Sequence, residues 1–256
     1  MKSFATIVSI FLIFMAATIS GYQSLPVYGH ANPASYIPKP NQKFTTVQSI
    51  PDKLSIVFTQ LPEVKASNIK VVDQNGLRVD KKDLSISEAD NKLSVSLDKS
   101  RMKDGIYTVN WLALSKEDGH VTKGSYVFTV QTANANTNTQ TINATNHPTL
   151  KQFSFIKDNA NLTLSISPFK TGHNTFNFAI NDMSGNPITN IKNVYLTLNN
   201  PGKSIGPISE TMEKISDGKF GLDGDFLSQN GEWNIKIVVQ RIGQYDINQE
   251  VKMEIK

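Results

Sequence analysis

The chain has 256 residues and a formal net charge of +4, and its basic and acidic side chains are interspersed rather than gathered into a basic block. This pattern excludes a surface built to follow the phosphates of a nucleic acid. Cysteine is absent, which also excludes disulfides, thiolate nucleophiles and zinc or iron–sulfur sites built on cysteine. Any metal chemistry therefore falls to histidine, carboxylates, methionine and backbone nitrogen.

The N-terminus is typical of an export signal. Lys2 precedes the apolar residues 4–19 and a polar tail, and Gly29 is a small residue suited to the last position before a signal-peptidase cut. We therefore predict a signal peptide over residues 1–29 and an exported mature chain that begins at His30, in the periplasm or another extracytoplasmic compartment. An earlier cleavage near residue 20 and an uncleaved signal that anchors the chain in a membrane are the alternatives.

Alternation of apolar and polar residues predicts β-strands in both halves of the mature chain. Residues 53–60 place apolar side chains at every second position. The same period recurs in six further segments: residues 92–98, 105–111, 125–130, 174–180, 193–198 and 231–239. A period of two buries one face of each strand, as in antiparallel sandwiches. We therefore predict an all-β chain, with Trp111 and Trp233 in its cores.

A polar tract divides the chain. Residues 132–146 consist mainly of Thr, Asn and Ala and have no hydrophobic period. Such a tract cannot bury a face, so we predict that it is a linker. It separates residues 30–131 from residues 147–256, and each segment has a normal size for a domain.

The connection between two predicted strands, within residues 114–130, contains Asp118 and His120 two positions apart. In an extended segment such residues point to the same side, and Gly119 lets the backbone bend between them. A carboxylate oxygen and an imidazole nitrogen can then converge on one metal ion. Glu117 is a rival carboxylate, although strand direction favours Asp118. Taken alone, the motif also fits an ordinary surface turn.

His30 supplies two more ligands if cleavage leaves it at the N-terminus. Its α-amine and its Nδ1 can bind the same ion, and with ordinary pKa values of about 7.7–8.0 and 6.5 both lose their protons near neutral pH at modest cost. With Asp118 and His120 the set becomes three nitrogens and one oxygen. This set suits Cu(II) best, whereas Zn(II) would bind it more weakly. The six methionines are scattered, which argues against a dedicated Cu(I) site.

These residues resemble the CopC copper-resistance family. The resemblance rests on His-Ala-Asn-Pro at residues 30–33, on Tyr-x-Val-x-Trp at residues 107–111 and, most specifically, on residues 115–130. It implies a seven-stranded Greek-key β-barrel or sandwich outside the cytoplasm. With the second half, the expected fold class is all-β, with two Greek-key, immunoglobulin-like β-sandwich (barrel) domains joined by the Thr/Asn-rich linker.

The resemblance also implies a high-affinity Cu(II) site whose ligands are His30, Asp118 and His120. Many members of the family have Ser-Ala-Asp before Gly-His, whereas this chain has one residue more and so retains Glu117. The chain also lacks the Met-rich loop that some members use for Cu(I), which fits a Cu(II)-only type.

The second half is similar to the YtkA/FixH-type β-sandwich, although the resemblance is less specific. It rests mainly on a Gly-x-Asn motif, here residues 172–174, before a predicted strand. His173 with Met183 or Met212 would form an accessory copper site, and His147 is a further candidate. The alternative is that both histidines are loop residues without a metal.

We therefore expect an extracytoplasmic Cu(II)-binding protein of copper homeostasis or resistance, and not an enzyme. It would act as a monomer that sequesters copper or delivers it to a separate membrane copper transporter or a cuproenzyme. Two alternatives stay open. One is a copper monooxygenase-like enzyme with the same histidine brace, as in lytic polysaccharide monooxygenases, and the other is a metal-free immunoglobulin-like adhesion or structural module.

Overall fold

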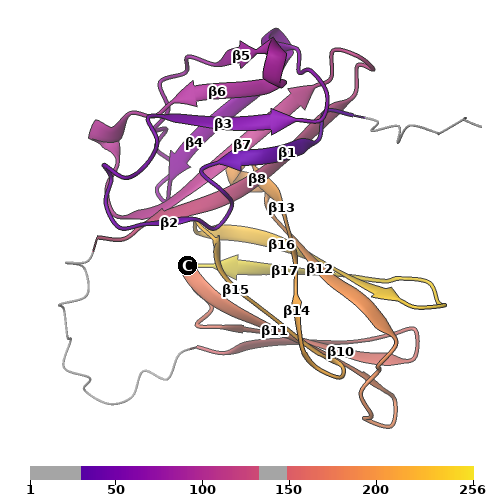
Figure 1. Ribbon diagram of the computed structural model, residues 1–256. Helices are drawn as coiled ribbons and strands as arrows, with labels where there is room; N and C mark the ends of the chain where they lie inside the picture. Colours follow the sequence, from indigo (N-terminus) through magenta and orange to yellow (C-terminus); the bar gives the residue numbers. More distant parts are fainter. Residues whose placement is uncertain (1–29, 133–148) are drawn as a thin grey trace, which may run out of the picture.

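The computed structural model describes residues 30–132 and 149–256 of the chain. The predicted all-β fold class is confirmed, because these residues form four β-sheets that pack in pairs as two β-sandwiches (Figure 1). The helices within these ranges are 3₁₀ segments of three residues each. None of the helices described there is long and apolar enough to cross a membrane.

Three predictions fall wholly or mainly on other residues. The signal peptide over residues 1–29 lies outside the described residues, as do most of the linker and His147. The predicted domain boundaries adjoin the linker and stay a prediction.

The first sandwich is drawn in indigo to magenta in Figure 1. One of its sheets has the strand order β1 (Pro33–Ile37), β3 (Lys53–Phe58), β6 (Lys92–Ser96) and β5 (Ser85–Ser87). The other sheet has the order β2 (Lys43–Phe44), β8 (Val121–Val130), β7 (Gly105–Leu114) and β4 (Asn68–Asp73). The resemblance implies seven strands, whereas the described residues of this sandwich form eight, because the two-residue β2 pairs in parallel with the end of β8. The connections include η1 (Val64–Ala66), η2 (Glu88–Asp90) and η3 (Lys99–Arg101).

The second sandwich, drawn in orange to yellow, also has two sheets. The first has the order β14 (Glu213–Ser216), β15 (Lys219–Leu227), β11 (Gly172–Asp182), β10 (Ala160–Ser167) and β9 (Lys151–Lys157). The second has the order β13 (Ile205–Thr211), β12 (Ile191–Asn200), β16 (Gly231–Arg241) and β17 (Ile247–Ile255). Segment η5 (Pro201–Lys203) joins β12 to β13.

The buried faces follow the predicted period of two. Leu54, Ile56 and Phe58 of β3 all point into the core of the first sandwich and are almost fully buried. Both tryptophans are core residues, as predicted: Trp111 packs edge-on against Phe58, and Trp233 belongs to the core of the second sandwich. Burial of these apolar faces is the main term that stabilises each sandwich.

Strands β7 and β8 differ from the prediction of one buried face. Ile106 and Val127 point away from the core of their own sandwich, yet both are buried, because they join the hydrophobic core of the second sandwich. The outer face of the sheet that contains β7 and β8 is therefore the surface on which the second sandwich docks. We call this contact the seam.

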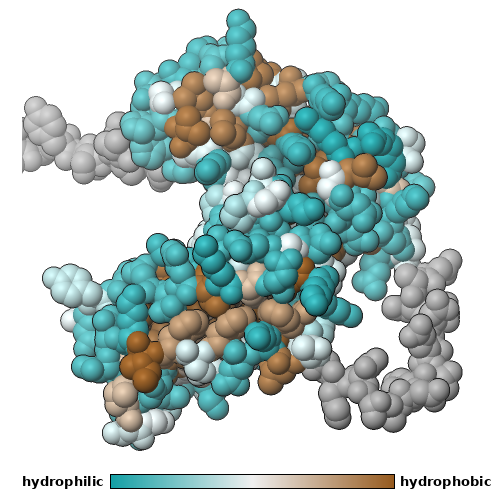
Figure 2. All heavy atoms as spheres, turned by 180° about the vertical axis from the view of Figure 1, so that it is seen from behind, coloured by the Kyte–Doolittle hydropathy of each residue, from teal (hydrophilic) through white to brown (hydrophobic). Residues whose placement is uncertain are grey.

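Hydrogen bonds between the two sandwiches reinforce the seam. Thr108 Oγ1 lies 2.8 Å from Ser228 Oγ in a fully buried contact. Thr129 Oγ1 donates to Asp225 Oδ2 at 2.7 Å, and the backbone N–H of Gly206 donates to Ser125 Oγ at 2.8 Å. Figure 2 shows the molecule from behind, where the surface along the seam is mostly hydrophilic.

A cavity of about 720 Å³ opens between the two sandwiches. Its walls come from both of them and include Lys70, Trp111, Lys123 and Asn234. None of the predicted metal ligands lines it. The candidate metal centre lies instead at one end of the first sandwich, where β1 begins and β7 turns into β8.

Candidate metal centre

His30 stands just before β1, and strand pairing fixes its place. β1 pairs antiparallel with β3, with Pro33 opposite Phe58. The side chain of Ala31, the residue between His30 and Asn32, is fully buried in the core of the first sandwich. The chain is therefore anchored one residue after the histidine, while His30 itself stays exposed.

Asp118 and His120 lie in the turn that joins β7 to β8. The backbone N–H of Ser115 donates to the carbonyl of His120 at 2.9 Å, and the N–H of Gly119 donates to the carbonyl of Ser115 at 3.0 Å. Gly119 has a φ of +70°, in the left-handed region that glycine adopts without a steric penalty. The connection is thus a closed turn, and the prediction of an extended segment is wrong.

The turn still brings the two side chains together, for a different reason. Ser115 Oγ accepts hydrogen bonds from the backbone N–H groups of Glu117 and Asp118, at 3.3 and 3.4 Å, and donates to Gln60 Oε1 at 2.9 Å. These bonds direct Asp118 back toward His120, whose own N–H donates to Asp118 Oδ1 at 3.1 Å. Alternation along a strand plays no part.

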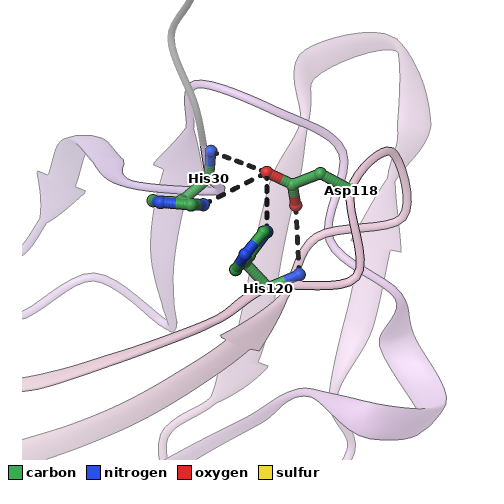
Figure 3. A group of neighbouring side chains, drawn as sticks. All are labelled: His30, Asp118 and His120. Atoms are coloured by element: carbon green, nitrogen blue, oxygen red, sulfur yellow. Dashed lines mark hydrogen bonds and ion pairs between the residues drawn. The ribbon is translucent and has the colours of Figure 1, made fainter.

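Three nitrogen atoms surround one carboxylate oxygen (Figure 3). Asp118 Oδ2 lies 3.0 Å from the backbone N of His30, 3.1 Å from His30 Nδ1 and 3.3 Å from His120 Nδ1. The two imidazole rings lie side by side, with their centroids 4.3 Å apart. The structure therefore brings together the three residues that the sequence analysis selects, from segments 88 positions apart.

Hydrogen bonds lower the pKa of the Asp118 carboxyl well below its usual range. The largest contribution comes from the N–H of His120, followed by contacts with Ser115 and His30, and partial desolvation opposes them. Asp118 is therefore a carboxylate at any physiological pH. The side chains of His30 and His120 are 46% and 63% exposed, so an ion in water can reach the cluster directly.

The donor set fits a single metal ion. One ligand atom from each of His30, Asp118 and His120 lies within 4.8 Å of the others. Two ligand atoms that each lie about 2 Å from one ion stand about 3–4 Å apart, and the two histidine Nδ1 atoms lie 3.1 and 3.3 Å from Asp118 Oδ2. Within the described residues, this is the one group of three histidines and carboxylates whose ligand atoms lie so close together.

The other candidates do not join this cluster. Glu117 is exposed and lies outside the group. His173 is the second residue of β11, and its Nδ1 lies 3.4 Å from Asp225 Oδ1. Met183 follows the far end of the same strand, about 30 Å away at the rise of an extended chain, and Met212 is buried in the core. The structure thus gives no support to an accessory site of His173 with Met183 or Met212.

Sequence reasoning missed the residues that hold the ligands in place. Ser115 organises the turn, and Thr59 and Thr122 contact the backbone around His30. The bonding partners of the two threonines are backbone groups that tertiary structure alone brings near, so no spacing in the sequence indicates them. For Ser115, its position at the start of the motif was the available signal.

Comparison with known proteins identifies the first sandwich. A protein-family model described as the CopC domain matches residues 38–131, so this part of the chain is a CopC domain. Asp118 and His120 lie inside the matched range, and His30 precedes it. The match ends before the second sandwich, whose similarity to YtkA/FixH-type domains stays a prediction.

Individual relatives agree with the family match. The chain is 30% identical over 84 residues to the copper transport protein CutJ of Bacillus subtilis (strain 168), an alignment that covers 32% of this chain and 16% of CutJ. It is 29% identical over 105 residues to protein YobA of Escherichia coli (strain K12), which covers 41% of this chain and 82% of YobA. The chain thus spans only about a sixth of CutJ.

Solved structures are also similar to part of this chain. CopC from Methylosinus trichosporium OB3b is 23% identical, with a TM-score of 0.35 over 41% of this chain and 96% of that one. PcoC from Escherichia coli, a methionine-rich copper resistance protein, is 24% identical, with a TM-score of 0.33 over 40% of this chain and 99% of that one. The family match and the copper transport relative together support a copper-related function.

Proposed function

We propose that this chain is an exported protein of copper homeostasis or resistance that binds Cu(II) through His30, Asp118 and His120. The observation that carries the proposal is the convergence of three nitrogens on Asp118 Oδ2, at 3.0 to 3.3 Å. Three nitrogens with one carboxylate oxygen form a donor set that Cu(II) binds more tightly than Zn(II) does. The copper-related relatives add to this support.

The proposal requires a free amine on His30. The backbone nitrogen of His30 already faces Asp118 Oδ2 at 3.0 Å, so a signal peptidase that cuts after Gly29 would leave an amine at the cluster. That amine and Nδ1 of the same residue would grip one ion, with His120 Nδ1 and Asp118 completing the set. Asp118 enters as a carboxylate, so copper competes with protons only at the three nitrogens.

The expected role is storage or transfer rather than catalysis. The ion is the cargo, bound by a monomer in the periplasm or another extracytoplasmic compartment, or at the membrane if the signal is retained. A membrane copper transporter or a cuproenzyme would receive or supply it. Because CutJ, to which part of this chain is similar, is named a copper transport protein, a membrane transporter is the partner we favour.

The test begins with the exported form of the full chain. Its intact mass identifies the first residue, and equilibrium dialysis against Cu(II) measures uptake. We expect a chain that begins at His30 and binds one copper ion. A chain that takes up no copper would favour the metal-free adhesion module.

The exposure of both histidine rings is also compatible with the monooxygenase-like alternative, because dioxygen could reach a bound ion. The carboxylate ligand argues against it, since it favours Cu(II) over the Cu(I) that such enzymes form. Peroxide production by the copper-loaded protein with ascorbate separates the two. Slow production is expected, and fast turnover would favour the enzyme.

A further inference from the structure

Two threonine hydroxyl groups hold the backbone on which His30 stands. Thr59 Oγ1 donates to the carbonyl of His30 at 2.9 Å and accepts from the N–H of Asn32 at 3.1 Å. Thr122 Oγ1 donates to the carbonyl of Ala31 at 2.6 Å. Three consecutive residues at the start of the predicted mature chain are thus bonded to side chains of two other segments.

The two threonines come from the segments that flank the site. Thr59 directly follows β3, and its backbone N–H also donates to the carbonyl of Asn32 at 2.8 Å. Thr122 lies in β8, two residues after His120, so the same strand end presents a ligand and a bond to the segment with the other histidine. The buried side chain of Ala31 lies between these contacts.

We propose that Thr59 and Thr122 are positioning residues that preorganise His30 for copper before the ion arrives. This inference rests on the proposed function of the site. A chain terminus is ordinarily poorly ordered unless something ties it down, and ordering it on binding weakens affinity. The two hydroxyl groups tie down this terminus in advance, and the backbone nitrogen and Nδ1 of His30 already face Asp118.

The hydroxyl groups, rather than the size of the side chains, carry this role. Valine replaces the hydroxyl of threonine with a methyl group of similar volume, so Thr122→Val leaves the carbonyl of Ala31 without its donor. Thr122→Ser keeps the donor and removes only a methyl group. At position 59 valine removes both a donor and an acceptor. Thr197→Val in the second sandwich is a matched control, because among the described residues its hydroxyl is hydrogen-bonded only to Ser209 Oγ, at 3.3 Å.

The first readout is Cu(II) affinity, measured by competition in full-length chains that begin at His30. We expect Thr122→Val to weaken binding about tenfold, and Thr59→Val with Thr122→Val to weaken it further, because partners behind a ligand typically contribute ten- to a hundredfold. Thr122→Ser and Thr197→Val should stay close to the parent protein. Equal affinities for the double valine variant and the parent would overturn the proposal.

The second readout needs no metal. Backbone NMR order parameters of Ala31 and Asn32 in the copper-free protein should have the values of rigid backbone, about 0.85, and fall below about 0.6 in the double valine variant. Unchanged order parameters would overturn the proposal even if copper bound elsewhere or not at all. A failure of copper binding in the parent, with order lost only in the variant, would instead refute the proposed function and leave the positioning role intact.

Discussion

The two sandwiches share an architecture and differ in what their connections carry. Each has a turn in which an aspartate accepts hydrogen bonds from the N–H groups two and four residues later, Asp73 in the first and Asp182 in the second. Each also has a histidine beside a carboxylate. In the first sandwich, His30 lies next to His120 and Asp118, so that three candidate ligands are close together. In the second, no third histidine or carboxylate among the described residues lies close enough to His173 and Asp225 to form a metal-binding group.

This difference shows that the fold supplies positions and the connections supply chemistry. Asp225 in the second sandwich also accepts a hydrogen bond from Thr129 of β8, so this carboxylate contributes to the seam. Asp118 in the first sandwich instead faces solvent and three nitrogens. A similar histidine–aspartate pair is therefore part of an interface in one sandwich and part of a candidate metal centre in the other.

Removing one histidine from each pair should give the largest difference. We expect His120→Ala to raise the Kd for Cu(II) about a thousandfold, because a ligand contributes more than the ten- to hundredfold of the partners behind it. His173→Ala is the control and should leave the Kd unchanged. Competition titration of both variants measures the effect. Equal losses in the two variants would show that the second sandwich also binds the ion.

The second prediction concerns the seam, where the two sandwiches are in contact. Val127 belongs to the first sandwich by sequence and to the second by its contacts. We expect Val127→Asp to lower the free energy of unfolding by about 2–3 kcal/mol, because it places a charge in an apolar contact. Leu77→Asp, at an exposed apolar residue of the first sandwich, should change it by less than about 0.5 kcal/mol. Denaturant unfolding of the full chain tests both, and a stable Val127→Asp variant would contradict docking of the two sandwiches.

The turn that presents Asp118 depends on a left-handed glycine. Gly119→Ala should cost about 1 kcal/mol of stability, because alanine at a φ of +70° is strained although no atom lies within 4 Å of the added Cβ. Thermal unfolding measures the loss, and Gly185→Ala in the Asp182 turn of the second sandwich, with a φ of +87° and equally open space around the added Cβ, is the matched control. A loss of Cu(II) affinity in Gly119→Ala alone would confirm that the turn serves the site.

The smallest effect concerns pH at the seam. Burial raises the pKa of Glu210 above 4.5, although a hydrogen bond from Asn41, at 3.3 Å, partly opposes this. Beside it, burial and the Glu210 charge raise the pKa of Tyr36 to about 12. A raised carboxyl pKa means that folding favours the protonated form, so stability falls as the pH rises from near 4.5 through the shifted pKa.

Glu210→Gln mimics the protonated form at every pH. The melting temperature of this variant should exceed that of the parent by an amount that grows across this pH window and then levels off. Melting curves of both proteins between pH 4 and 7 provide the test. A constant difference would show that Glu210 titrates with the same pKa in the folded and unfolded chain.

The strands were predictable because burial of one face leaves a period of two in the sequence, as in β3 and β6. The docking of the second sandwich was not predicted, although the sequence contains a signal for it. Ile106 to Val109 and Tyr126 to Phe128 are nearly unbroken apolar runs, which are typical of strands buried on both faces. Seven of the strands are predicted from the sequence, and β2 is among those that are not, because two residues cannot show a period.

The candidate ligands were predictable from residue chemistry, and their geometry was not. A chain with four histidines and no cysteine restricts the choice of ligands, and the motif around Asp118 and His120 pointed to one connection. The hydrogen bonds that bring Asp118 round to His120 depend on Ser115 and Gln60, which lie 55 residues apart and meet only in the folded chain. The same is true of the threonines that hold the backbone of His30.

The proposed copper centre depends most on the nitrogen of His30 as a ligand. The direct measurement is the Cu(II) affinity of two chains by competition titration, one that begins at His30 and one that retains Gly29 before it. The extra residue turns the amine into an amide and leaves every side chain in place. We predict about a hundredfold weaker binding for the longer chain, and equal affinities would contradict the histidine brace.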